Sequence, residues 1–465
     1  MKLNSTEVLV AEQGSTVDLT TGNIWENIWH MSWPMLIVMF FNFLVGLTDV
    51  YVAGFIGPEI QAIVGFVSQL YFSTIIVANA ISIGTVAMLS RAIGAGRFRD
   101  ALSAARQSLL FGFVCAMALT ASGLIFHSQI VSLAGFSANI RQVAEDFFVI
   151  FALALAPNYM VILSTAVFRA GGEVRLTLLA MSLISVINIA LNFLLIFGLF
   201  SFQGLGYRGI AIATSTSMFA GMIICLVLYR KSRWKNIFSG PWNLSTYLIR
   251  KIFLLSWPAA LVQISWNASY IILYNILGRL QEGSITAMAA FTNSLRIEAI
   301  IYLPVFALNM AASVLTGQNL GAGAPERAEK IGWTISFSGV ALVSAMALPI
   351  FIWASDISSP VAKDSLVLDE TVRYLRIMML SEPFLALSVI LGGCLQGAGD
   401  TKGTMLVIVS ALWIIRLPLA YLLAIVAGYG AFGVWTAMAI SMCFQGIAMT
   451  VRFRKGRWKH TRPWG

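Results

Sequence analysis

One carboxylate and four uncharged polar side chains lie inside stretches of the chain that are otherwise hydrophobic. They are Asn42, Asp49, Asn188, Asn192 and Thr214. The first two are seven residues apart and the next two are four apart, so each pair shares one face of a helix. A carboxylate at the centre of a membrane helix costs about 2.5–3.5 kcal/mol on insertion scales, so its position needs a reason.

Carboxylate, amide and hydroxyl oxygens together are typical ligands of a small hard cation, or surround an acid that binds a proton. The pattern therefore favours a Na⁺ or proton site at Asp49, Asn188, Asn192 and Thr214. The alternative, in which these groups only hold neighbouring helices together by hydrogen bonds, stays open.

A second polar set follows a helical stripe with spacings of three, four, seven and eleven residues. Its members are Gln263, Trp266, Asn267, Tyr270 and Tyr274. Such a stripe faces water or a partner, and its rings can hold a flat apolar cation by stacking and cation–π contact. The alternative, an aromatic belt at the membrane interface, suits Tyr274 but neither amide. We predict that the first four residues, with Asn42, line a substrate cleft.

Four charged residues lie within later hydrophobic stretches. They are Arg296, Glu298, Glu382 and Arg416. Arg296 and Glu298 are two positions apart and point to different faces of a helix, so neither is the other's only partner. We add both to the predicted substrate cleft, with Glu382 and Arg416 as candidate partners across helices. A buried structural ion pair remains an equal alternative.

Several enzyme classes lack their signatures here. The chain has no Walker phosphate-binding loop and no zinc-protease histidine pair, and its three histidines lie at span ends or in a tail. Gly397-Ala398-Gly399-Asp400 resembles an intramembrane aspartyl protease motif, but we interpret it as a loop and helix start. The four cysteines have no metal-binding spacing and are expected to pack as small apolar residues. We predict that the protein is not an enzyme and needs no cofactor beyond H⁺ or Na⁺.

The elements that carry these residues are membrane spans. Of 465 residues, 58% are hydrophobic and 11% charged, and the mean hydropathy is +0.84. A helix needs about 20 apolar residues to cross the bilayer core. Twelve such stretches are expected near residues 30–52, 62–88, 103–125, 145–168, 176–199, 209–229, 249–277, 285–315, 331–354, 371–395, 404–427 and 431–451. A short interfacial helix near 24–29 would precede them.

The two halves of the chain repeat each other. Gly94-Ala95-Gly96 returns as Gly321-Ala322-Gly323, and Ala170-Gly171-Gly172-Glu173 returns as Gly397-Ala398-Gly399-Asp400, both 227 residues later. Because six spans bring the chain back to its starting side, the halves are parallel repeats. The fold class is therefore an all-α integral membrane protein with two pseudo-symmetric six-helix bundles around a central cleft, an arrangement typical of transporters.

Charge distribution predicts the orientation. Most of the 30 Lys and Arg residues fall in loops on the side of the N-terminus, which the positive-inside rule places in the cytoplasm. The net charge of +10 is spread over seven inner segments, so it does not indicate nucleic-acid binding. We predict a multi-pass inner-membrane protein with both termini cytoplasmic. Its parts are a segment 1–29, an N-lobe 30–229, a linker 230–248, a C-lobe 249–451 and a basic tail 452–465.

The chain resembles the multidrug and toxic compound extrusion (MATE) transporters over nearly all of residues 30–455. The resemblance rests on Pro34 with Asp49, Gly94-Ala95-Gly96, Phe168-Arg169-Ala170-Gly171-Gly172, Asn188-Ile189-Ala190-Leu191-Asn192 with Phe197-Gly198, Gly317-Gln318-Asn319-Leu320-Gly321-Ala322-Gly323, Gly397-Ala398-Gly399-Asp400-Thr401 and Arg416-Leu417-Pro418. The similarity is greatest to the branch called DinF-like.

This resemblance implies twelve helices in two lobes and secondary active efflux of amphipathic, often cationic compounds in exchange for H⁺ or Na⁺. It assigns ion coupling to Asp49, Asn188, Asn192 and Thr214, where many prokaryotic relatives have aspartate in place of Asn192. We expect a monomer whose partners are drug-like molecules and the lipid bilayer. The alternative is a flippase of lipids or lipid-linked oligosaccharides from the same superfamily.

Overall fold

The computed structural model describes residues 18–132, 138–198, 204–240 and 243–461. Within them, all regular elements are helical, and the chain forms two compact units. The N-terminal unit contains Trp33–Ser256, and the C-terminal unit contains Asn23–Ser32 and Trp257–Gly465. Both boundaries fall at a repeated Ser-Trp-Pro sequence inside a long helix, where Pro34 and Pro258 each remove a backbone hydrogen bond.

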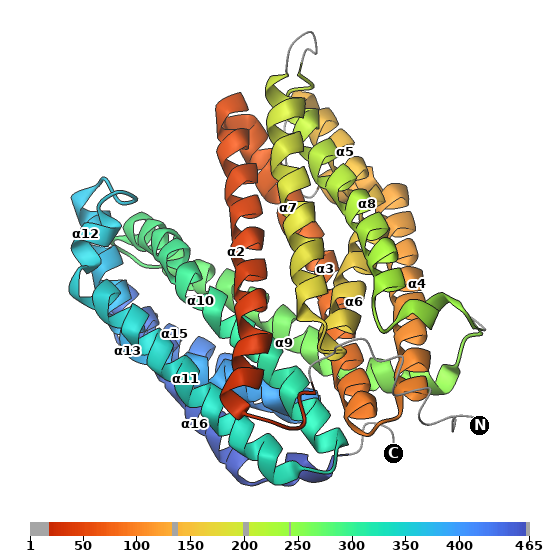
Figure 1. Ribbon diagram of the computed structural model, residues 1–465. Coiled ribbons are helices and arrows are strands. Elements are labelled where there is room, and N and C mark those ends of the chain that lie inside the picture. The colour runs from red at the N-terminus through yellow and green to blue at the C-terminus, as the bar shows by residue number, and fades with distance from the viewer. Residues whose placement is uncertain (1–17, 133–137, 199–203, 241–242, 462–465) are drawn as a thin grey trace, which may run out of the picture. The chain divides into compact units, whose positions relative to one another are not determined.

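The first half of the chain supplies α2 to α8 (Figure 1). These helices are α2 Ile24–Ile56, α3 Pro58–Gly94, α4 Phe98–Ser132, α5 Ala138–Leu153, α6 Leu155–Ala170, α7 Val174–Phe197 and α8 Tyr207–Lys231, followed by the short 3₁₀ helix η1 Lys235–Phe238. The expected separate helix near 24–29 is wrong, because α2 runs without a break from Ile24 into the first span.

The second half supplies α9 to α16. Its helices are α9 Thr246–Gly278, α10 Ser284–Gly321, α11 Pro325–Ile352, α12 Ala354–Ser358, α13 Ser365–Ala398, α14 Thr401–Ser410, α15 Leu417–Tyr421, α16 Gly430–Arg454 and η4 Arg457–His460. Two wider π-helical turns, η2 Ala411–Arg416 and η3 Leu422–Val426, flank α15. Pro418 lies between them, where it removes a backbone donor from the eleventh span.

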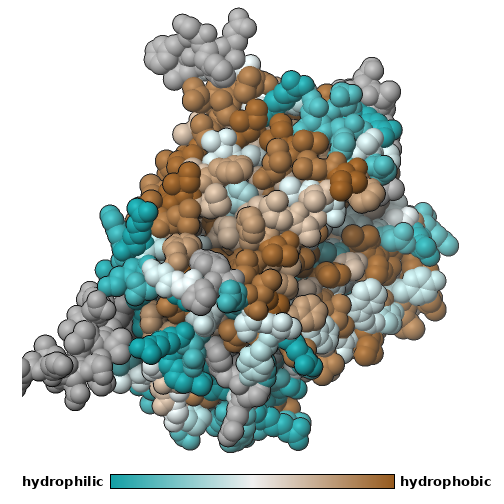
Figure 2. Space-filling model, turned by 90° about the vertical axis from the view of Figure 1, so that its right-hand side faces the viewer, coloured by the Kyte–Doolittle hydropathy of each residue, from teal (hydrophilic) through white to brown (hydrophobic). Residues whose placement is uncertain are grey.

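Helix length and composition confirm the predicted membrane fold. Eleven of the described helices are long and apolar enough to cross a bilayer, and α5 with α6, bent by 40°, makes a twelfth when taken as one span. Pro157 accounts for the bend, because it has no N–H to donate to the carbonyl of Leu153. Figure 2 shows broad hydrophobic surface with hydrophilic residues gathered toward its margins, as expected where lipid covers the spans.

The repeat seen in the sequence is also a repeat of backbone geometry. Gly96 and Gly323 have φ angles of 71° and 74°, and Gly172 and Gly399 have 80° and 95°. These left-handed conformations suit glycine because it lacks a Cβ. The glycine-rich loops are therefore tight turns between helices.

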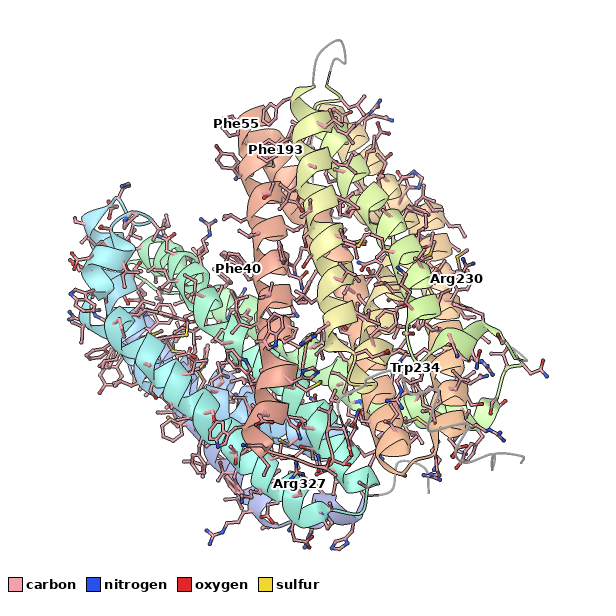
Figure 3. The ribbon with its side chains drawn as sticks, viewed as in Figure 1. Phe40, Phe55, Phe193, Arg230, Trp234 and Arg327 are labelled. Carbon is pink, nitrogen blue, oxygen red and sulfur yellow. The ribbon has the colours of Figure 1, made fainter. Side chains whose placement is uncertain are left out.

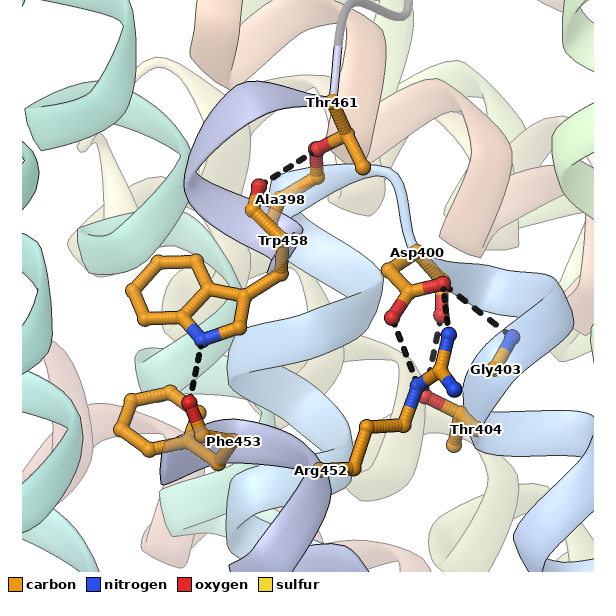
Figure 4. A network of polar contacts seen from close by, with 8 residues as sticks. All are labelled: Ala398, Asp400, Gly403, Thr404, Arg452, Phe453, Trp458 and Thr461. Atoms are coloured by element: carbon orange, nitrogen blue, oxygen red, sulfur yellow. Dashed lines mark hydrogen bonds and ion pairs between the residues drawn. The ribbon is translucent and has the colours of Figure 1, made fainter. Parts of the chain in front are cut away.

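The turn at Gly399 is held by a polar network at the end of the C-terminal unit (Figure 4). Asp400 caps α14 by accepting from the Gly403 N–H at 3.2 Å, and Arg452 donates two hydrogen bonds of 2.8 Å to its carboxylate. Thr461 donates to the Ala398 carbonyl oxygen at 2.6 Å. These contacts confirm that Asp400 starts a helix.

Candidate functional site

The predicted ion-site residues meet in one hydrogen-bonded chain within the N-terminal unit. The Asn192 Nδ2 group of α7 donates to Asp49 Oδ1 of α2 at 2.7 Å and to Asn188 Oδ1 at 3.1 Å. Asn188 Nδ2 in turn donates to Thr214 Oγ1 of α8 at 3.3 Å. These side chains thus join three helices. The two bonds between different helices link residues that are 26 and 143 positions apart in the sequence.

The four hydrogen-bonded side chains are buried to different degrees. Asn188 and Asn192 have no exposed surface, and Thr214 is buried, whereas Asp49 is half-buried. The Asn192 Oδ1 atom is buried without a hydrogen-bond partner. An unpaired buried acceptor is costly, and a cation or water bound between the amide and the carboxylate would satisfy it.

Sequence reasoning missed one member of this cluster. Ser217 accepts from Asn188 Nδ2 at 3.3 Å and is fully buried; it lies three residues after Thr214, a spacing that identifies the same helix face. Asn42 is exposed on α2 and, among the described residues, joins no hydrogen bond of the cluster. Its assignment to a substrate cleft stays a prediction.

The aromatic stripe of α9 forms part of a ring cluster in the C-terminal unit. Tyr274 packs on Phe291 of α10 with ring centroids 4.9 Å apart, and Phe291 packs on Trp435 at 5.5 Å. Trp266 and Tyr270 continue the row at 6.1 Å. Gln263, Trp266, Asn267 and Tyr270 are all half-buried, so each retains some accessible surface.

A buried charged cluster borders these rings. Glu298, Glu382 and Arg416 each have no exposed surface, and the ion pairs formed by described residues include none of them. The Arg416 guanidinium lies 4.9 Å from the Trp266 ring centroid and donates through Nε to Ser441 at 2.8 Å. The predicted direct pairing of these charges is therefore wrong.

Glu298 has hydroxyl partners instead. Its Oε2 atom accepts hydrogen bonds of 3.1 Å from Tyr302 and Tyr374. Arg296, two residues earlier, is exposed, which confirms that the two side chains face different directions. The remaining oxygens of Glu298 and Glu382 and both terminal nitrogens of Arg416 are buried without partners. The π-helical turn that ends at Arg416 carries this side chain into the cluster.

The described part of the chain has no group of three or more His, Cys, Asp or Glu side chains suited to a metal ion. The N-terminal cluster has one carboxylate with amide and hydroxyl groups, which suits a monovalent cation or proton better than a tightly bound divalent metal. Its role in ion binding stays a prediction.

Polar groups inside the spans of a duplicated helical membrane protein are typical of one class, the membrane transporters. Comparison with known proteins identifies the family. The MatE family model matches residues 34–194 and 258–422, so the chain belongs to the MatE family and is a MATE transporter.

The relatives and solved structures cover almost the whole chain. A protein named Probable multidrug resistance protein NorM, from Thermotoga maritima, is 25% identical over 90% of this chain and 89% of its own length. An uncharacterized transporter of Bacillus subtilis, YisQ, is 24% identical over 93% of this chain and 94% of its own. A structure described as the outward-facing conformation of a multidrug resistance MATE family transporter has a TM-score of 0.85 at 21% identity, covering 96% and 98% of the two chains.

Proposed function

We propose that this protein exports amphipathic, often cationic compounds in exchange for H⁺ or Na⁺. The observation that carries the proposal is the chain of hydrogen bonds from Asp49 through Asn192 to Asn188. Asp49 is its only carboxylate among these three side chains, and it is half-buried. A charge in that position changes its interactions when a proton or cation binds, so one ion can favour one access state over another.

The proposed substrate class rests on the C-terminal unit. Trp266 and Tyr270 are half-buried and keep accessible ring surface, and the Trp266 ring already holds one cation, the Arg416 guanidinium, at 4.9 Å. Aromatic faces of this kind suit flat cations. The names of several relatives, which describe multidrug resistance proteins, agree with this class. We also propose an inner-membrane location with both termini in the cytoplasm.

Reconstituted transport tests the coupling assignment. Asp49→Asn keeps the shape of the side chain but removes its charge, so we expect gradient-driven accumulation of a fluorescent cation in proteoliposomes to fall to the level of protein-free liposomes. Imposing a pH gradient or a Na⁺ gradient alone separates the two coupling ions. Thr48→Val is the matched control, because the Thr48 hydroxyl donates to the Leu44 carbonyl of the same helix at 2.9 Å and bonds no other group of the described residues. Full gradient-driven transport by Asp49→Asn would remove Asp49 from the mechanism.

A further inference from the structure

An apolar groove lies on the N-terminal unit, away from the polar cluster. It has a volume of about 250 Å³ and is lined by α4, α6, α8 and the end of η1. The lining residues are Leu109, Leu110, Phe113, Met160, Ser164, Met222, Leu226, Tyr229 and Phe238. α6 packs against both α4 and α8, and all three helices contribute lining residues. The three helices are labelled in Figure 1.

The rim of the groove is open. Phe113 and Phe238 are each 44% exposed and Leu226 is 42% exposed. These helices are candidate membrane spans, so in a bilayer the exposed apolar rim contacts lipid chains rather than water. The occupant that fits the groove on chemical grounds is therefore an apolar chain.

Basic residues gather at the end of the groove that η1 closes. Arg106 lies one turn before Leu109 and Leu110 on α4, and its Nε and Nη2 atoms donate to the carbonyls of Ile237 and Asn236 at 2.6 and 2.7 Å. Both acceptors are neutral, and Arg106 forms no ion pair with the described residues, so its positive charge is not neutralised by a carboxylate.

The end of α8 and the turn after it carry further positive charge, and Arg230 lies one helical turn after the lining residue Leu226 on the same helix face. Arg230, Lys231 and Lys235 are exposed, while Trp234 between them is fully buried, with its ring 5.2 Å from that of Phe98. Figure 3 labels Arg230 and Trp234 on this part of the chain. The buried indole anchors the segment to α4, which holds the neighbouring basic side chains near the membrane surface.

The second half of the chain repeats this basic segment but lacks the groove-forming residues. Arg230-Lys231-Ser232-Arg233-Trp234-Lys235 returns as Arg454-Lys455-Gly456-Arg457-Trp458-Lys459. At the positions 227 residues after Arg106 and Leu110, however, stand Trp333 and Phe337. Their rings stack at 5.7 Å, and Trp333 packs on Phe453 at 5.2 Å. Large rings thus stand at the repeated sequence positions where the first half has an arginine and a leucine.

We propose that this groove binds one anionic phospholipid, with an acyl chain along α6 and the phosphate at Arg106 and Arg230. Charge complementarity identifies the headgroup, because basic residues near the membrane surface attract anionic lipids. The proposed orientation of the protein assigns the site to the cytoplasmic leaflet. The site is separate from the ion cluster, so transport coupling can fail without loss of lipid binding.

Lipid binding to detergent-purified protein tests the proposal. The probes are phosphatidylglycerol and phosphatidylcholine with the same acyl chains, added at equal concentration, with retained lipid counted by native mass spectrometry and stability measured by melting. For the wild type we expect one tightly retained phosphatidylglycerol and a melting temperature several degrees above that with phosphatidylcholine. Glycerol phosphate, which has no acyl chain, should leave the melting temperature unchanged.

The internal repeat provides matched variants. Arg230→Gln should remove most of the phosphatidylglycerol-specific shift in melting temperature. Arg454→Gln makes the same charge change at the repeated position in the other half and should keep that shift. Leu110→Phe introduces the residue type found at the repeated position and should fill the groove, so the retained lipid should be lost while the protein still folds.

Three results would overturn the proposal. The first is equal stabilisation by phosphatidylglycerol and phosphatidylcholine. The second is an equal loss of the phosphatidylglycerol-specific melting shift in the Arg230 and Arg454 variants. The third is full lipid retention by Leu110→Phe. A dimer of the lipid-free wild type that Leu110→Phe converts to a monomer would instead identify a second copy of the chain as the occupant.

Discussion

At the scale of single residues, the N-terminal cluster depends on whether position 192 donates or accepts a hydrogen bond. The Asn192 amide donates to Asp49 at 2.7 Å, which stabilises one negative charge without adding another. A carboxylate at the same place could only repel Asp49 unless a proton or cation lay between them. The type of side chain at 192 therefore sets how much positive charge the site requires.

Asn192→Asp tests this relation. Two carboxylates at hydrogen-bonding distance should repel, and a Na⁺ ion between them should relieve the repulsion. We expect about a tenfold gain in Na⁺ affinity, or about 1.4 kcal/mol, measured as a larger melting shift with NaCl than with KCl. Adding Asp49→Asn should cancel the gain. An unchanged Na⁺-specific shift in the single variant would mean that residues 49 and 192 do not share an ion.

At the scale of elements, equivalent turns in the two units use different polar anchors. The C-terminal unit pairs Asp400 with Arg452. In the N-terminal unit, Glu173 Oε1 accepts from the Arg233 backbone N–H at 2.9 Å, and the Arg233 side chain donates to the Gly171 carbonyl at 3.2 Å. Burial raises the pKa of the Glu173 carboxyl above its ordinary value, although the Arg233 N–H and charge oppose this effect.

Glu173→Gln should therefore have a pH-dependent effect on stability. Since the folded protein holds this proton more tightly than the unfolded chain, the proton's stabilising contribution is full at low pH and is lost as pH rises through the folded-state pKa. Gln keeps the acceptor oxygen and has no charge to bury. Relative to wild type, we expect the variant to gain about 1–2 °C in melting temperature near pH 8 and nothing near pH 4.

The control for this measurement is Glu282→Gln, which changes an exposed glutamate outside the helices. Its effect should not vary with pH. A difference between Glu173→Gln and wild type that stays constant from pH 4 to pH 8 would show that burial does not perturb Glu173.

At the scale of the whole molecule, the distribution of basic residues predicts the orientation in the membrane. A single cysteine at Ser239, which is exposed after η1, tests it in a background where Cys115, Cys225, Cys394 and Cys443 are replaced. We expect a membrane-impermeant maleimide to label this cysteine in broken cells but not in intact cells. Labelling of intact cells would reverse the predicted orientation.

Much of the fold could be predicted from the sequence because a bilayer demands it. Apolar stretches of span length, charges kept to the ends and repeated glycine turns each follow from local physical constraints. Asp49, Asn188 and Asn192 could be selected because polar groups in such stretches are costly, and spacing alone identified the shared face of the two asparagines. The membrane fold and the family are confirmed on this basis.

Tertiary structure decided which side chains meet. Asp49 and Asn192 are 143 residues apart in sequence, and helix periodicity cannot specify contacts between different helices. The same limit explains why Arg416 was a candidate partner for Glu298, whereas Glu298 accepts from Tyr374 of another helix and from Tyr302 one turn along its own. It also explains why the groove beside Arg106 was not foreseen: a cavity depends on the volumes of side chains from several helices, and no single stretch of sequence contains that sum.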